Sequence, residues 1–184
     1  LAAIEKDELT GLYTRQAFYH HARTFTHFMT EEKFNVVILD VADFKLINGT
    51  YGTKKGNEVL VYLSNAFRYY VKNGLLTRYE GVQLLGLFHS KVKMDVERIN
   101  RNINKIAEEA PIPNIRIKVG IYEDVDTNLS IPIICDRALM AEKSISKDFK
   151  TNVAFYTDEL NQKQLAQRQM ENTLNLRLRI ENSR

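Results

Sequence analysis

Residues 34–48 read FNVVILDVADFKLIN, and the first half of this stretch decides how the chain folds. From Phe34 to Leu39 the side chains are mainly apolar and β-branched, a pattern typical of a strand that is buried on both faces. The run ends at Asp40, a carboxylate. We therefore predict a central buried strand here, with helices packed against it and an acidic side chain at its end.

The segments on either side of this strand show helical or strand periodicity in turn. Apolar residues recur at helical spacing from Thr14 to about Thr30, with Thr14 in the position of an N-cap, and again from Val59 to Tyr70. Strands that alternate with helices in this way indicate an α/β or α+β sandwich with helices on a central sheet. The other expected elements are a hairpin of residues 75–79 and 82–88 turning at Glu80-Gly81, helices over residues 91–109 and 134–145, strands over residues 115–121 and 153–156, and a polar helix from Thr157 onward.

Length and composition limit the class of protein. The chain has 184 residues, of which 44% are hydrophobic and 27% are charged, and this suits one soluble globular domain with short appendages. The net charge of +3 comes without a dense basic stripe, so nothing indicates nucleic-acid binding. No apolar run approaches the roughly 18 residues of a membrane span, and the single cysteine, Cys135, excludes an internal disulfide. We therefore expect neither nucleic acid nor a membrane as a direct partner of this fragment.

Five short segments, in chain order, carry a resemblance to a known family. They are DELTGL at residues 7–12, DVADFKLIN at residues 40–48, Gly52 and Gly56 with Val59-Leu60, RYEGVQL at residues 78–84, and DRALMAEK at residues 136–143. They resemble, respectively, the motifs D-x-L-T-G-L, D-x-D-x-F-K-x-I-N, G-H-x-x-G-D-x-V-L, R-Y-G-G-D/E-E-F and the late A-D-x-A-L-Y-x-A-K helix of GGDEF domains, the diguanylate cyclase family.

The resemblance implies both a fold and a reaction. The fold would be of the nucleotidyl cyclase type, with a five-stranded central sheet surrounded by helices. The reaction would join two GTP molecules, one on each of two facing subunits, into cyclic di-GMP. Phosphoryl transfer of this kind depends on positioning and on charge neutralisation, and Mg²⁺ takes oxygen ligands such as carboxylates. In the family these carboxylates come from the position of Asp40 and from the acidic pair of the hairpin.

The signature hairpin departs from the family pattern at this acidic pair. In Glu80-Gly81-Val82-Gln83-Leu84, Val82 and Gln83 stand where the family has two carboxylates, so Asp40 is the only remnant of the metal site. Valine offers no ligand, and glutamine offers one neutral oxygen, which suits a hard dication poorly. We therefore expect no intact catalytic residues and no required cofactor, with Mg²⁺ entering only together with bound GTP. Alternatively, Asp40 or Asp43 could cap the following helix.

Nucleotide binding is a separate question from catalysis. By resemblance, Lys45 and Lys143 would meet phosphates, Asn48 and Asn57 would hold the guanine edge, and Lys147 stands where the family often has an arginine. The residue at position 57 is an aspartate in the family, and it would accept two hydrogen bonds from guanine. A single amide cannot do this without turning its own donor towards another donor. We therefore expect GTP affinity to be reduced or lost.

The expected domain organisation follows the resemblance. Residues 1–6 would end an upstream signalling helix, residues 7–157 would form the GGDEF-like domain, and residues 158–184 would be an exit helix towards an EAL phosphodiesterase domain. The family's product-inhibition motif, R-x-x-D, would fall on Val71 and Gly74, so no inhibitory cyclic di-GMP site is expected. We expect a cytoplasmic location, with any membrane anchor upstream of this fragment.

The leading hypothesis is a degenerate GGDEF domain that acts as a regulatory or dimerisation module, with a second copy and an EAL domain as partners. Two alternatives remain open at this point. One is a GTP-binding sensor without turnover, and the other is a residually active diguanylate cyclase, for example in a heterodimer with an intact partner. Val82 argues most directly against the residually active cyclase.

Overall fold

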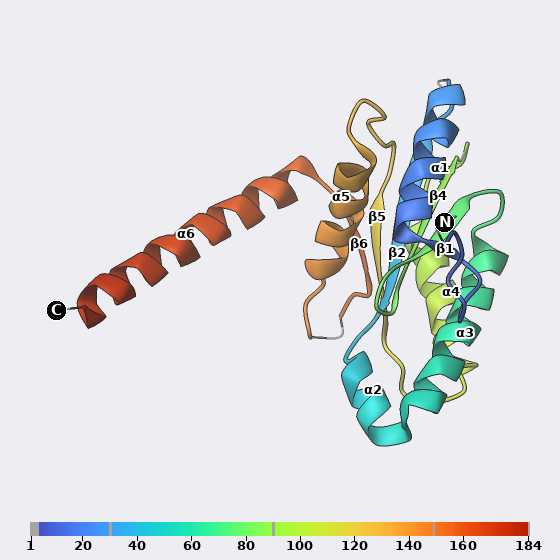
Figure 1. Cartoon of the computed structure of the whole chain (residues 1–184), viewed down its shortest axis with the longest axis horizontal. Coiled ribbons are helices and arrows are strands. Elements are labelled where there is room, and N and C mark those ends of the chain that lie inside the picture. Colours follow the sequence, from blue (N-terminus) through green and yellow to red (C-terminus); the bar gives the residue numbers. More distant parts are fainter. Residues whose placement is uncertain (1–3, 30, 90, 149, 184) are drawn as a thin grey trace.

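The computed structural model describes residues 4–29, 31–89, 91–148 and 150–183, and it shows a mixed sheet with helices on both faces (Figure 1). Within these ranges the sheet has six strands in the order β1-β3-β4-β2-β5-β6. The α/β class expected from the sequence is thus confirmed. In chain order the elements are β1 (Tyr13–Thr14), α1 (Arg15–Phe28), β2 (Phe34–Val41), α2 (Phe44–Tyr51), α3 (Thr53–Tyr70), β3 (Leu75–Glu80), β4 (Gln83–His89), α4 (Val96–Glu108), β5 (Ile117–Tyr122), α5 (Ile131–Lys143), β6 (Val153–Phe155) and α6 (Asp158–Asn182).

Strand β2 lies at the centre of the sheet, as its apolar sequence predicts. It pairs antiparallel with β4 on one side and with β5 on the other. Because successive side chains of a strand point to opposite faces, Val36 and Ile38 pack under α1 and α5, whereas Val37 and Leu39 pack under α3 and α4. Each face of the sheet therefore has its own hydrophobic layer, and both layers bury β2.

Several element boundaries differ from the sequence-based prediction. The sixth strand, β1, is a two-residue segment parallel to β3, with Tyr13 opposite Thr77, and it is too short to have a period of its own. Helix α4 begins at Val96, not near residue 91, because Asp95 caps it by accepting hydrogen bonds from the two N–H groups of Glu97 and Arg98 at 3.0 and 3.4 Å. The predicted N-cap of α1 is confirmed, since Thr14 Oγ1 accepts the N–H of Ala17 at 3.4 Å.

Several segments lie together at one end of the sheet because of the directions of the strands. Since β2 is antiparallel to β4 and β5, the C-terminal end of β2 lies beside the β3–β4 turn and beside the start of β5. Helix α5 packs along β5 and leads into β6, which is parallel to β5, so the last turn of α5 reaches this same end. Helix α2 and the first turn of α3 lie there as well (Figure 1). We call this end of the sheet the α2 end.

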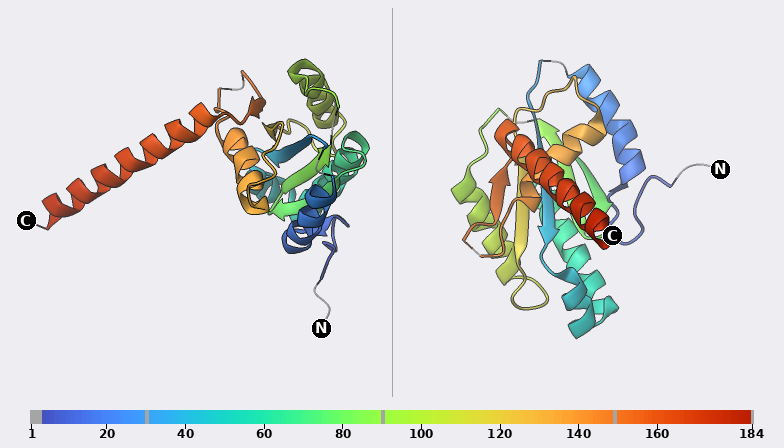
Figure 2. Two further views of the ribbon diagram at one scale, coloured as in Figure 1. Left: turned by 90° about the horizontal axis from the view of Figure 1, so that it is seen from above. Right: turned by 90° about the vertical axis from the view of Figure 1, so that its left-hand side faces the viewer.

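Helix α6 projects away from the rest of the molecule (Figures 1 and 2). Thr157 caps it by accepting the N–H of Leu160 at 3.2 Å, and Gln164 donates a hydrogen bond to the carbonyl of Met140 on α5 at 3.3 Å. None of its described residues is buried. None of the helices in the described ranges combines the length and the hydropathy that a transmembrane segment requires. At the other terminus, Lys6 bridges to Tyr13 in the sheet, and residues 1–3 of the expected upstream helix lie outside the described residues.

Candidate functional site

The signature hairpin keeps its turn and is braced by an arginine. Gly81 has φ +54°, a left-handed conformation that glycine adopts without strain. Arg78 Nε donates to the carbonyl of Gly81 at 2.7 Å, and Arg78 Nη1 pairs with Asp7 Oδ1 at 3.2 Å. The same aspartate accepts hydrogen bonds from the backbone N–H and the hydroxyl of Thr10 at 2.9 and 2.7 Å. The first motif of the chain, DELTGL at residues 7–12, therefore stabilises the hairpin through Asp7.

Four polar side chains meet at the α2 end of the sheet, on the face covered by α5; we call them the polar cluster. They are Asp40 at the end of β2, Gln83 at the start of β4, Lys118 on β5 and Glu142 on α5. Asp40 and Lys118 are direct partners in the β2–β5 register. Gln83 Nε2 donates to Asp40 Oδ2 at 3.5 Å, and Lys118 Nζ lies 2.9 Å from Glu142 Oε1.

Glu142 is the most buried member of the polar cluster, with a residue exposure of 1%. Burial raises the pKa of its carboxyl group above the ordinary value, and the nearby Asp40 carboxylate raises it further, whereas Lys118 works in the opposite direction. The Lys118 contact is an ion pair and not a well-directed hydrogen bond, because Glu142 Oε1 has no hydrogen-bond partner among the described residues. A buried carboxylate therefore depends on one lysine for its charge compensation.

The residues present do not suit a divalent cation. The Lys118 ammonium already lies 2.9 Å from Glu142 and opposite Asp40 in the strand register, where it would repel a second cation. One oxygen of Asp40 accepts the N–H of the next residue at 2.8 Å, and the other faces the Gln83 amide. The side chain of Val82, in the turn, adds no oxygen ligand. Within the described ranges, no group of three or more His, Cys, Asp or Glu side chains could hold a metal ion.

Neither Asp40 nor Asp43 caps helix α2 in the expected way. Asp40 Oδ1 accepts the N–H of Val41, which lies three residues before the helix begins at Phe44. Asp43 occupies the N-cap position in a left-handed conformation with φ 55°, and its side chain makes no capping hydrogen bond. The capping interpretation is wrong for both residues, because the chain turns into α2 through this backbone conformation instead.

The predicted nucleotide-binding residues all lie on segments at the α2 end of the sheet. Lys45 is exposed on α2, Asn57 is exposed on α3, and Lys143 and Lys147 are exposed at and just beyond the end of α5. Asn48 differs from these four, because its Oδ1 is buried and has no hydrogen-bond partner among the described residues. This oxygen points at the backbone of α3, where an added Cβ on Gly56 would lie 2.0 Å from it. The roles of these residues in nucleotide binding stay predictions.

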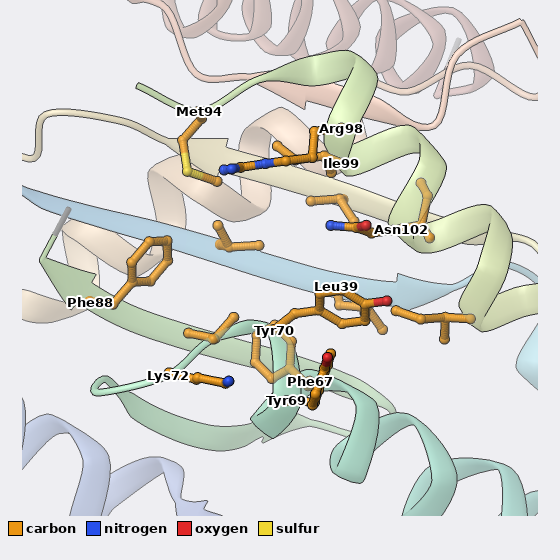
Figure 3. A pocket seen from close by; sticks show the side chains of 15 residues that line it. Leu39, Phe67, Tyr69, Tyr70, Lys72, Phe88, Met94, Arg98, Ile99 and Asn102 are labelled. Carbon is orange, nitrogen blue, oxygen red and sulfur yellow. The ribbon is translucent and has the colours of Figure 1, made fainter. Parts of the chain in front are cut away.

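A pocket of about 520 Å³ opens on the opposite face of the sheet, between α3 and α4 (Figure 3). Its wall is mainly apolar, with Phe67, Tyr70, Met94 and Ile99 among its side chains, and Lys72 and Arg98 also contribute. Val71, which occupies the first position of the missing R-x-x-D motif, lines it too. None of the predicted catalytic or nucleotide-binding residues lines this pocket.

Sequence reasoning missed Lys118 and Glu142. A signal was present for Glu142, which lies four residues after Ala138 on the buried face of its helix. Lys118 gave no such signal, because it stands at an alternating polar position of the strand at residues 115–121. Charged residues at positions that periodicity predicts to be buried are rare unless they are paired. Glu142 also stands at the third alanine of the family's A-D-x-A-L-Y-x-A-K pattern, where the pattern has no charge.

The sequence matches the family model described as diguanylate cyclase, GGDEF domain, over residues 4–147. Among curated proteins, the chain is similar to the diguanylate cyclase DgcM of Escherichia coli, with 27% identity over 127 residues, covering 65% of this chain and 30% of DgcM. It is also similar to the uncharacterized protein YhcK of Bacillus subtilis, with 25% identity over 160 residues, covering 77% of this chain and 44% of YhcK. The chain thus spans less than half the length of these curated relatives.

Solved structures share the fold. The GGDEF domain of YfiN, also called TpbB, from Pseudomonas aeruginosa superposes with a TM-score of 0.73 and 22% identity, covering 88% of this chain and 99% of that one. LapD of Vibrio cholerae, solved as S helix-GGDEF-EAL bound to c-di-GMP, gives a TM-score of 0.66 and 14% identity, covering 92% of this chain and 42% of that one. At these identities the likeness concerns the fold alone.

Proposed function

Because the chain belongs to the GGDEF domain family of diguanylate cyclases, we propose that it serves cyclic di-GMP signalling as a degenerate domain that has lost the cyclase reaction. Its role would then be to regulate an attached domain or to dimerise with a second copy of the chain. The observation that carries this proposal is the state of the hairpin and of Asp40. Val82 and Gln83 replace the acidic pair, and the remaining carboxylate faces the Gln83 amide instead of an open metal position.

The energetic consequence is large for this reaction. Attack of a 3′-hydroxyl on an α-phosphate with loss of pyrophosphate builds up negative charge that must be neutralised. Loss of a charge-neutralising group costs several kcal/mol of transition-state stabilisation, and each ~1.4 kcal/mol lowers the rate about tenfold. The Lys118 charge does not replace this function, because Glu142 already pairs with it inside the protein.

The test is a product assay. The chain is incubated with GTP and either Mg²⁺ or Mn²⁺, and cyclic di-GMP is measured by chromatography. We expect no product above the blank, both for the wild-type chain and for Asp40→Ala. Product that appears with the wild-type chain and disappears in Asp40→Ala would instead support the residual cyclase.

A second candidate, a GTP sensor without turnover, has one observation in its favour. Lys45 and Lys143, the two lysines that match the family's phosphate-contacting positions, remain exposed at the α2 end of the sheet. Calorimetric titration with GTP distinguishes the candidates. Heat that is lost in the Lys45→Ala and Lys143→Ala variants would support the sensor, whereas no heat at millimolar GTP supports a purely structural role.

The proposal extends to an EAL domain beyond residues 158–184. Helix α6 supports it, since this 25-residue helix projects from the domain with exposed apolar side chains such as Leu165, Met170 and Leu174. LapD, which shares the fold, combines GGDEF and EAL domains in one chain. The test compares cyclic di-GMP hydrolysis by the full-length protein with and without residues 7–157; equal rates would argue against regulation by this domain.

A further inference from the structure

The polar cluster is built by the sheet and does not arise by chance at the surface. Asp40 and Lys118 face each other across the β2–β5 ladder, and Gln83 directly precedes the β4 residues that pair with β2. Side chains at directly opposed strand positions lie within contact distance on the same face. The Lys118 side chain is 21% exposed and the Glu142 side chain is 2% exposed. The ion pair is therefore held inside the protein by four elements.

Gly120 explains how a glutamate from a helix comes so close to the strand. It lies two residues after Lys118 on β5, on the same face of the sheet. A Cβ added there would lie 2.2 Å from the carbonyl oxygen of Ala138 and 2.5 Å from the backbone nitrogen of Glu142. The backbone of α5 thus packs directly on the strand at this glycine, and this packing delivers Glu142 to Lys118.

The charges of the cluster resemble those of an occupied cation site. Two carboxylates flank the Lys118 ammonium: Asp40 is the direct partner of Lys118 in the β2–β5 register, and the buried Glu142 reaches it from α5. Such a pair is stable only if one carboxylate is protonated or a cation lies next to both. The cation here is the Lys118 ammonium, 2.9 Å from Glu142 and opposite Asp40 in the register.

We propose that the Lys118 ammonium is a tethered counter-cation that takes the place of a divalent ion in the polar cluster, so that its removal opens a latent divalent-cation site formed by Asp40 and Glu142. An ammonium is a compact point charge and can neutralise a carboxylate as an ion does, but it cannot leave. The polar cluster therefore stays neutralised whatever the concentration of free Mg²⁺ or Mn²⁺. The inference rests on the proposed function for its site, but it concerns equilibrium ion binding and not turnover.

The experiment is a titration of the chain with MnCl₂ alone, followed by the paramagnetic resonance signal of free Mn²⁺. We expect no binding by the wild type at submillimolar Mn²⁺. Lys118→Ala should bind one Mn²⁺ per chain at least about tenfold more tightly, because two charged oxygen ligands become available. The double variant Lys118→Ala with Glu142→Gln should lose this gain. Lys105→Ala, which removes an exposed lysine from α4 on the other face, is the matched control and should behave as the wild type.

Thermal unfolding keeps the test decisive if Lys118→Ala folds poorly. Its Tm should rise when EDTA is replaced by Mn²⁺, whereas the Tm of a Lys118→Met, Glu142→Met double variant should not respond. The inference is overturned if the wild type binds Mn²⁺ and loses it on Asp40→Asn, or if Lys118→Ala shows neither binding nor a Mn²⁺-dependent Tm. Product formation from GTP in the same preparations would overturn the proposed function, whereas Mn²⁺ binding by the wild type without any product would overturn this inference alone.

Discussion

Replacing Gly120 by alanine should destabilise the domain by about 3 kcal/mol, at the upper end of what overpacking a core costs. The added Cβ would lie 2.2 Å from the carbonyl oxygen of Ala138, 2.5 Å from the backbone nitrogen of Glu142 and 2.8 Å from its Cβ. A carbon and a carbonyl oxygen normally stay at least about 3.3 Å apart. Because two of the three atoms belong to the backbone of α5, no side-chain rotation relieves the clash, and the helix must move by about 1 Å.

The assay is urea unfolding followed by circular dichroism, with the free energy extrapolated to water and the slope compared between variants. Gly49→Ala is the matched control, since Gly49 lies in α2 and a Cβ there would meet nothing within 4 Å. That substitution should leave the stability unchanged or raise it by up to about 1 kcal/mol, because alanine favours helix. A Gly120→Ala variant within about 0.5 kcal/mol of wild type would refute the close packing of α5 on β5.

Three further results are expected. Hydrogen bonds from Thr10 and the charge of Arg78 lower the pKa of Asp7 despite its burial. Asp7→Asn should therefore lower the free energy of unfolding at neutral pH, and its difference from the wild type should shrink as the pH falls below 3.8. A difference that stays constant down to pH 2 would contradict the role of the charge. Burial raises the pKa of the Cys135 thiol to about 12. A disulfide reagent at pH 8 should therefore react with Cys135 no faster than the domain unfolds. An immediate absorbance burst would contradict the burial of this thiol. Tyr62→Phe removes a 2.7 Å hydrogen bond to a carbonyl of α4 and should cost about 1 kcal/mol in urea unfolding; an unchanged midpoint would argue that water replaces the bond.

The fold was largely predictable because burial and periodicity agree along most of the chain. The apolar run after Phe34 predicted the central strand, and Glu80-Gly81 predicted the turn of the hairpin. The errors have local causes. Asp95 starts helix α4 later than the apolar spacing suggests, because a side-chain cap overrides the pattern. Strand β1 has only two residues, so it leaves no pattern to find.

The candidate site was predictable only in part. Asp40 and the replaced pair at Val82 and Gln83 lie on motifs that can be read from the sequence. Lys118 and Glu142 are 24 residues apart, and their contact depends on α5 crossing β5 at Gly120, which no local pattern contains. The charge of Glu142 at a buried helix position was the available warning, because a charge is rarely buried without a partner.

Whether the polar cluster around Asp40 binds dications decides both proposals. Anomalous diffraction at the manganese edge answers this for crystals of the chain soaked with MnCl₂ and a GTP analogue that cannot be cleaved at its α-phosphate. We predict no anomalous peak within coordination distance of Asp40 or of the hairpin turn at Val82. Two manganese peaks between these residues, bridging the analogue's phosphates, would contradict both the loss of the cyclase reaction and the role of Lys118.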